Sequence, residues 1–256
     1  MKKQTKPAAY AQALAREFRG EPANPARWAP RLGLEIHEVD ADGFDGALVR
    51  ARELPLGAIV IRKSIREAGR KNFTVAHELG HFLLPGHDRG ELVCTAHDVA
   101  NWSDSSKQIE READEFAAEI LMPSALVERI IQSVPPSLPA IEKLARRFHT
   151  SLSAAAWRYC ELAKEPCAIV WSTKGRIAWS KRSDSFPYSL PKGAPIRKRA
   201  LAERALAGLT ISRQAQEVPV HSWILAIASP AGMKLFEQSK ALPAYDSVLS
   251  LLWLRE

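Results

Sequence analysis

The sequence predicts an α+β protein: a small sheet packed on helices, then a helical extension, then a C-terminal α+β domain. Three observations support this class. Short strand-like runs fill residues 34–62, an apolar stripe at helical spacing covers residues 108–163, and strand-like runs return after residue 166. Because 46% of the 256 residues are hydrophobic, the chain can bury a sizeable core without disulfide bonds.

The first third of the chain alternates between helix and strand signals. An Asn-Pro pair at residues 24–25 places a capping side chain before a proline, which is a preferred start of a helix. Asp-Gly pairs at residues 42–43 and 45–46 predict a turn into a returning strand. The elements expected here are helices at residues 8–18 and 25–32 and strands at residues 34–39, 47–52 and 58–62. The last strand is continuously apolar, and we expect it to offer an edge to an extended peptide.

The middle of the chain is predicted to be helical, and its end returns to strands. Prolines at residues 135, 136 and 139 mark the clearest linker. The expected helices are residues 72–84, 108–122, 123–131, 140–148, 152–163 and 196–206, and the expected strands are residues 167–171, 177–179, 223–228 and 248–254. This pattern predicts three parts, at residues 1–133, 134–165 and 166–256.

Charge and cysteine content exclude several classes of protein. The chain has 36 Lys and Arg against 29 Asp and Glu, and this net charge of +7 suits an acidic partner or nucleic acid without identifying either. Three scattered cysteines are too few for the disulfide framework of a secreted protein. No signal peptide is recognisable, and no run approaches the ~18 apolar residues of a membrane span. We therefore expect a cytoplasmic protein with no membrane partner.

The most specific feature is the pentapeptide His77-Glu78-Leu79-Gly80-His81. On a helix, side chains four residues apart lie on one face, so both imidazoles can reach one cation. Glu78 then stands beside the open coordination position, where its carboxylate can accept a proton from water. The neighbouring residues are apolar, and buried ionisable groups need partners or a metal. The motif predicts a zinc site, with another divalent cation such as Mn²⁺ as the alternative.

A catalytic zinc site needs a third protein ligand, and three residues are candidates. His87 has the spacing of the third histidine in one class of zinc protease, but Leu84 replaces the glycine that turns the chain in that class. Glu110 and Asp114 lie four residues apart on the next long helix. Glu110 could bind zinc while Asp114 holds the other ring nitrogen of a ligating histidine. We favour Glu110, with Glu112 and His87 as the alternatives.

Two blocks of sequence resemble the ImmA/IrrE family of metallo-endopeptidases. The blocks are residues 73–81, FTVAHELGH, and residues 110–123, EREADEFAAEILMP. The resemblance implies a zincin-like, gluzincin-type peptidase unit that hydrolyses peptide bonds. In such a unit His77, His81 and Glu110 hold zinc, and Glu78 is the general base.

The resemblance also covers the following segment. Residues 141–158 are similar to the helix-turn-helix-like segment of longer family members. In those members the C-terminal domain is GAF-like and sensory, which implies a small-molecule or redox signal for residues 166–256. The family also implies a protein substrate in the cytoplasm: a helix-turn-helix repressor of the XRE type, whose cleavage derepresses stress-response or mobile-element genes.

The alternative function is a DNA-binding transcriptional regulator, which would use the helix-turn-helix-like segment and the basic C-terminal third. A recognition helix offers polar side chains to base edges. Residues 151–159 are instead mostly alanine and aromatic, which suits packing. Direct binding of nucleic acid is therefore the weaker hypothesis.

Other residues have candidate roles that the motifs leave open. The candidates for stabilising the oxyanion of the reaction are His87, His97 and Tyr159. Cys94 lies between the two zinc blocks, where a thiolate could cap the metal as a redox latch. A small, partly buried residue is the simpler interpretation of Cys94, and Cys160 and Cys167 are expected in the core.

Overall fold

The computed structural model describes residues 6–18, 23–50, 57–87, 92–94, 104–224 and 233–255. They form a mixed α+β protein, as predicted, in two compact units that each have a sheet. The first unit is Met1–Ser124 with Ala145–Ser151, and the second is Ala125–Leu144 with Leu152–Glu256. The predicted division at residues 133 and 165 stays a prediction.

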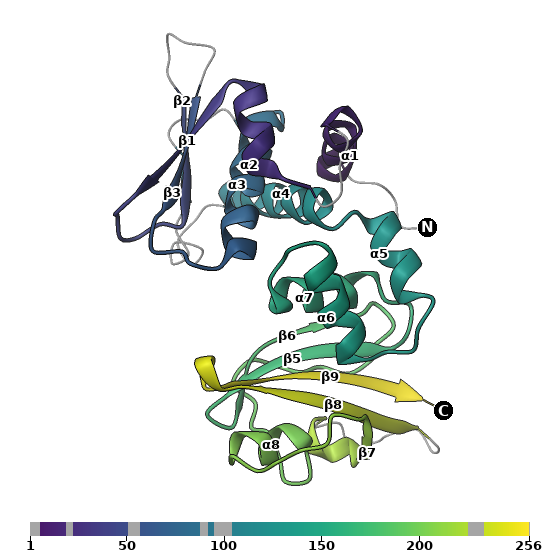
Figure 1. The fold of residues 1–256 in the computed structure, drawn as a ribbon. Helices are drawn as coiled ribbons and strands as arrows, with labels where there is room; N and C mark the ends of the chain where they lie inside the picture. The colour runs from purple at the N-terminus through teal and green to yellow at the C-terminus, as the bar shows by residue number, and fades with distance from the viewer. Residues whose placement is uncertain are drawn as a thin grey trace. The chain divides into compact units, whose positions relative to one another are not determined.

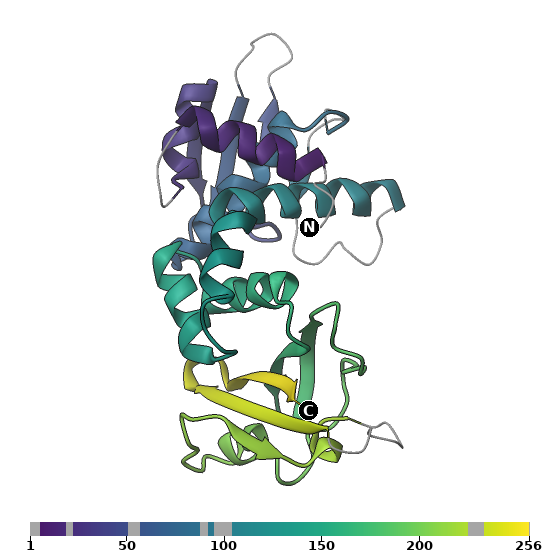
Figure 2. The same ribbon diagram turned by 90° about the vertical axis from the view of Figure 1, so that its right-hand side faces the viewer.

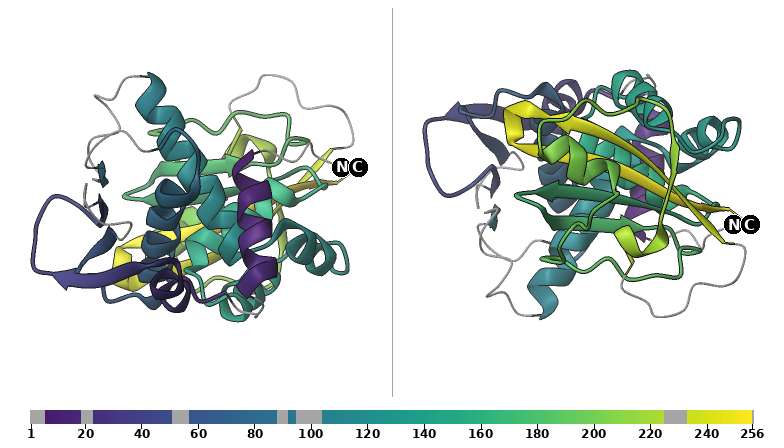
Figure 3. Two further views of the ribbon diagram at one scale, coloured as in Figure 1. Left: turned by 90° about the horizontal axis from the view of Figure 1, so that it is seen from above. Right: turned by 90° about the horizontal axis from the view of Figure 1, so that it is seen from below.

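The first unit packs a four-stranded sheet against helices. Its strands are β1 (Leu34–Val39), β2 (Gly46–Arg50), β3 (Gly57–Arg62) and β4 (Leu92–Cys94), in the order β1-β3-β2-β4. Its long helices are α1 (Lys6–Phe18), α3 (Ala68–Leu83) and α4 (Asp104–Leu121). Seen from above, the sheet, α3, α4 and α1 follow one another as layers (Figure 3, left). Figure 2 shows α1 lying along α4, where Gln12 donates a hydrogen bond of 3.0 Å to Glu119.

The strand order corrects two predictions. β2 does not return alongside β1, because β3 lies between them, parallel to β1 and antiparallel to β2. The expectation that residues 58–62 offer an open edge was therefore wrong, since both sides of β3 are hydrogen-bonded to neighbouring strands. A continuous apolar run is typical of a central strand, whereas the alternating pattern of β1 suits an edge with one solvated face.

Local sequence signals set the start and end of the short helix before the sheet. The side chain of Asn24 accepts a hydrogen bond of 3.1 Å from the backbone of Arg27, and Pro25 begins α2 (Pro25–Trp28), as predicted. The chain continues as a 3₁₀ turn, η1 (Ala29–Leu32). This turn ends at Gly33, which has a φ of 81°. That left-handed conformation is the one that favours glycine at a helix C-terminus.

The two helices that carry the sequence blocks approach each other closely at Gly80. A Cβ atom on Gly80 would lie 3.2 Å from the Cα of Ala113 and 3.2 Å from the ring of Phe116. Ala113 and Phe116 are both fully buried. The glycine of the motif therefore allows α3 and α4 to pack at a distance where their polar side chains meet.

A short segment later in the chain returns to the first unit and completes it. Residues 145–151 include Phe148, which lines a small apolar cavity of about 140 Å³ together with Trp28 and Leu121. Thr150 donates to the sulfur of Met122 at 3.6 Å. A Cβ atom on Gly69 would lie 2.7 Å from the backbone nitrogen of Ser151, so this turn rests directly on the start of α3.

The second unit has a five-stranded antiparallel sheet. Its strands are β5 (Cys167–Thr173), β6 (Arg176–Arg182), β7 (Gln216–Val218), β8 (Lys234–Leu242) and β9 (Ser247–Arg255), in the order β6-β5-β9-β8-β7. Its helices are α5 (Ser124–Ile131), α6 (Leu138–Arg147), α7 (Leu152–Leu162) and α8 (Leu201–Leu206). The α6 and α7 helices lie on one face of the sheet and α8 on the other (Figure 1; Figure 3, right). The predicted hairpin at residues 167–179 and the predicted final strand are confirmed.

A buried carboxylate explains two errors of prediction in this unit. Glu237 accepts hydrogen bonds from the backbone of Leu201 and Ala202 at 2.9 and 2.7 Å, and from Trp223 Nε1 at 2.8 Å. The helix expected at residues 196–206 begins only at Leu201, where Glu237 satisfies its first backbone donors. Trp223 follows a 3₁₀ turn, η3 (Val220–Ser222), and is not in a strand; residues 225–228 of that predicted strand lie outside the described residues.

Helix α7 packs into the core, as the alanine and aromatic composition of residues 151–159 predicted. Ala155, Ala156 and Tyr159 of α7 are buried, and so are Cys160 and Cys167, both free thiols. The helix therefore does not present the polar surface that base recognition requires.

None of the described helices combines the length and apolar character that crossing a membrane requires.

Candidate metal centre

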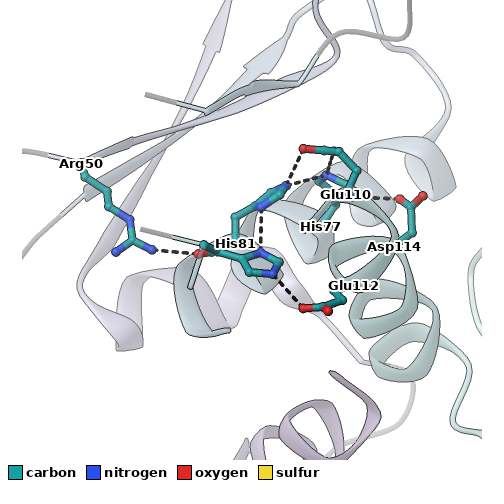
Figure 4. A network of polar contacts seen from close by, with 7 residues as sticks. Arg50, His77, His81, Glu110, Glu112 and Asp114 are labelled. Atoms are coloured by element: carbon teal, nitrogen blue, oxygen red, sulfur yellow. Dashed lines mark hydrogen bonds and ion pairs between the residues drawn. The ribbon is translucent and has the colours of Figure 1, made fainter. Parts of the chain in front are cut away.

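Two histidines of α3 and one glutamate of α4 converge on one point (Figure 4). His77 Nε2 lies 2.9 Å from His81 Nε2 and 3.1 Å from Glu110 Oε2, and His81 Nε2 lies 3.4 Å from Glu110 Oε1. Among the described residues, these three form the group whose ligand atoms could hold a metal ion, all within 4.8 Å of one another. The structure thus brings together the three residues that the sequence favoured as ligands.

Asp114 sets the orientation of the first histidine. One turn after Glu110 on α4, its Oδ1 accepts a hydrogen bond of 2.9 Å from His77 Nδ1. A carboxylate only accepts, so Asp114 favours the tautomer of His77 that has its proton on Nδ1 and its lone pair on Nε2. This geometry is the one expected of a residue that holds a metal-binding histidine from behind.

The other two candidate ligands lie behind His81. His87 follows the turn after α3, and its Nδ1 lies 3.0 Å from His81 Nδ1. The Nε2 of His87 lies 3.2 Å from Glu112 Oε2. His87 is almost fully buried, and neither it nor Glu112 joins the three-residue group.

Arg50 at the end of β2 was not predicted to belong to the site. Its guanidinium donates to the backbone carbonyl of His81 at 2.8 Å and to that of Phe82 at 3.2 Å (Figure 4). The last carbonyls of a helix have no partner within the helix, so this contact satisfies the end of α3. A single arginine at the end of a strand carries no sequence signal that distinguishes it from a solvated one.

The electrostatics of the group favour neutral imidazoles beside an ionised carboxylate. Burial lowers the pKa of His81 below its ordinary value. Burial alone would raise the pKa of Glu110, but the contacts of its carboxylate with His77 and His81 outweigh that effect and lower it to about 2. At neutral pH the three side chains therefore offer two nitrogen lone pairs and one carboxylate charge.

This donor set fits a divalent metal. With the proton of His77 held on Nδ1, its Nε2 lone pair faces His81 and the charged Glu110 at about 3 Å. Lone-pair atoms at that separation repel one another unless a cation lies among them. Two imidazoles and one carboxylate are the ligands of a catalytic metal that keeps one coordination position open.

Glu78 is fully buried on the side of α3 that faces the sheet. A Cβ atom on Gly46 of β2 would lie 2.8 Å from Glu78 Oε1 and would overlap the methyl group of Thr74. Strand β2 therefore packs directly on this carboxylate. Only glycine at residue 46 leaves the space that Glu78 occupies.

Comparison with known proteins identifies the family. Residues 29–159, about half of the chain, match Peptidase family M78, described as the IrrE N-terminal-like domain. The chain belongs to this family. The resemblance stated from the two sequence blocks is thereby confirmed.

Two curated relatives of this IrrE-like chain are named radiation response metalloprotease IrrE. The protein from Deinococcus radiodurans is 25% identical over 185 residues, which cover 64% of this chain and 56% of the relative. The protein from Deinococcus deserti is 28% identical over 152 residues, which cover 54% of this chain and 53% of the relative. The chain spans about half the length of these relatives.

A solved structure shares the fold of the IrrE-like chain. It is a Mycobacterium tuberculosis transcriptional regulator, similar with a TM-score of 0.56 and 14% identity over 97% of this chain and 87% of that one. At this identity the similarity concerns the arrangement of the backbone alone.

The remaining site candidates of the IrrE-like chain stay predictions. His97 and the side chain of Cys94 lie outside the described residues, so the proposed oxyanion role and redox latch have no structural account. Tyr159 is buried in the second unit, where burial raises the pKa of its hydroxyl. His87 has both ring nitrogens in polar contacts within the first unit.

Proposed function

We propose that the protein is a zinc-dependent endopeptidase of the gluzincin type. The observation that carries this proposal is the convergence of His77, His81 and Glu110 on one point. Membership of a peptidase family and the names of the two curated relatives support it. The zincin-like description of the first unit belongs to the same proposal.

Each residue of the site has a proposed part in peptide hydrolysis. His77, His81 and Glu110 would hold zinc, with Mn²⁺ as the alternative, and Asp114 would fix the ring of His77. When bound, zinc lowers the pKa of water and polarises the scissile carbonyl. A carboxylate oxygen of Glu78 accepts a proton from the attacking water and passes it to the leaving amine nitrogen. One water is thus added across the peptide bond.

The substitution Glu78→Gln tests this mechanism. It preserves the size of the side chain and leaves the three proposed ligands intact, so zinc binding should remain stoichiometric while cleavage of a co-expressed repressor is lost. Glu17→Gln, at an exposed position of α1, is the matched control and should retain cleavage. Full activity of Glu78→Gln would contradict the mechanism. Less than one zinc per chain in the reconstituted native protein would contradict the metal centre itself.

The proposed substrate is a helix-turn-helix repressor of the XRE type, cleaved in the cytoplasm to derepress stress-response or mobile-element genes. The radiation response in the names of the relatives supports a stress-related role. Co-expression with candidate repressors, followed by mass spectrometry of the fragments, tests the substrate. Intact repressor beside active enzyme would exclude that candidate.

The proposed role of the C-terminal part is to receive a signal, through a GAF-like domain that binds a small molecule or responds to redox conditions. The antiparallel five-stranded sheet, built from residues 167–255, supports this architecture. The proposed division remains residues 1–133 for the peptidase, residues 134–165 for the helix-turn-helix-like segment and residues 166–256 for the sensor.

A further inference from the structure

We propose that His87 and Glu112 are positioning residues that fix the tautomer of His81 and thereby raise the affinity of the centre for its metal. The inference rests on the proposed metallopeptidase function and extends it to two residues outside the three-ligand group. Its basis is a continuous line of polar contacts from α4, through the turn after α3, to the buried ring of His81.

The contacts on the Nδ1 side of His81 permit one arrangement of protons on the neutral rings of His81 and His87. Glu112 as a carboxylate can only accept, so His87, 3.2 Å away, carries its proton on Nε2. His87 Nδ1 is then an acceptor. The Nδ1 of His81, 3.0 Å away, must supply the proton between the two rings. His81 Nε2 is left with its lone pair, directed at His77 and Glu110.

Glu112 is itself held in place for this role. Gln108, one helical turn earlier on α4, donates to Glu112 Oε1 at 2.9 Å. The other oxygen, Oε2, remains for His87.

The two histidines of the motif are oriented differently because they are buried differently. Asp114 contacts His77 directly, and its own side chain is 59% exposed, so its charge is solvated. His81 is fully enclosed, and a carboxylate placed directly behind it would be a buried charge, which is costly. The neutral ring of His87 lies between His81 and Glu112 instead and accepts the Nδ1 proton of His81. The charged carboxylate of Glu112 stays nearer to the solvent, with 34% of its side chain exposed.

The same contacts argue against His87 as a ligand. Its Nδ1 faces the Nδ1 of His81 and its Nε2 faces Glu112, and His87 does not join the group of His77, His81 and Glu110. The role that the geometry leaves to His87 is to act through His81.

Substitutions at residue 87 of the full-length protein separate positioning from simple packing. His87→Leu keeps the apolar bulk and removes the acceptor, and we expect it to weaken zinc binding by about 10–100-fold in chelator competition. His87→Asn places Oδ1 near the former position of Nδ1, and its affinity should return to within about 10-fold of the native value. Glu112→Gln removes the charge and should fall between these. His37→Asn, at an exposed histidine of β1, is the control.

Nuclear magnetic resonance of the ring nitrogens in the zinc-loaded protein provides a second readout. The hydrogen-bonded Nδ1 proton of His81 should give a low-field signal in the native protein and in His87→Asn, and lose it in His87→Leu. Equal zinc affinity and an unchanged His81 signal in a folded His87→Leu protein would overturn the inference. If that variant does not fold, native affinity in Glu112→Gln would overturn it. Failure of the native protein to bind zinc would instead overturn the proposed function.

Discussion

The protons of two buried histidines decide what the centre can bind. Asp114 favours the proton of His77 on Nδ1, so the lone pair of Nε2 is directed toward His81 and Glu110. The residues of the pentapeptide were predictable because helical spacing alone places His77 and His81 on one face. Glu110 was predictable from its position one turn before Asp114 together with the family resemblance.

Other residues of the site were beyond prediction for a physical reason. The place of His87 depends on the turn after α3, where Gly86 has a φ of 85°, and on where that turn ends relative to Glu112. The spacing of residues along the chain does not reveal the direction in which this turn carries His87. For the same reason the sequence left His87 open as a candidate ligand, although the fold places it against the Nδ1 side of His81.

Acid should destabilise the metal-free protein from about pH 6.5 downward. Burial lowers the pKa of His81 from 6.5, so its contribution to stability is complete above pH 6.5 and is lost as the pH falls through the lower folded value. Glu110, with a pKa lowered from 4.5 to about 2, contributes fully above pH 4.5 and loses that contribution between pH 4.5 and about pH 2.

Urea unfolding of chelator-treated protein at a series of pH values measures this dependence. The variant His81→Leu, which has no imidazole at this position, should lack the part of the slope that begins near pH 6.5. An identical slope in the native protein and in His81→Leu would show that the burial of this ring does not govern the acid response.

At the scale of elements, strand β2 and helix α3 meet at Gly46. We expect Gly46→Ala to destabilise the fold by about 1–3 kcal/mol, because the added methyl group overlaps Thr74 and presses on Glu78. Peptidase activity should fall as well, since Glu78 must shift. Urea unfolding and a cleavage assay measure the two effects.

A double-mutant cycle with Thr74→Ser distinguishes this contact from a general intolerance of alanine at residue 46. Serine lacks the methyl group that the new Cβ would meet, so Gly46→Ala should cost less stability in the Thr74→Ser background. The same loss of stability in both backgrounds would contradict the proposed contact.

Periodicity predicted most helices and strands but not how the strands pair. The order β1-β3-β2-β4 places a parallel neighbour beside β1, and a parallel pairing depends on the connection between strands and not on a local turn. The helix expected at residues 196–206 was too long, because Glu237, distant in sequence, caps it at Leu201. Both errors of prediction thus arose because contacts between residues distant in sequence determine the strand order and the start of this helix.

At the scale of the whole molecule, removal of the metal should affect one unit. Zinc bound at 1,000 times its dissociation constant would stabilise the folded state by about 4 kcal/mol. The proposed ligands all lie on α3 and α4 of the first unit. We expect a chelator to speed amide hydrogen exchange in α3 and α4 and to leave β5, β8 and β9 unchanged. Equal acceleration in both units would contradict a metal centre confined to the first.

The path of the chain has a consequence for any attempt to divide the protein. It leaves the first unit after residue 124, re-enters it at residue 145 and leaves again after residue 151. The re-entrant segment supplies Phe148 and the turn that rests on Gly69. No single cut therefore separates the two units, because a cut after residue 151 leaves residues 125–144 of the second unit attached to the first. A shortened protein that ends before residue 151 would expose the start of the helix that carries the metal motif.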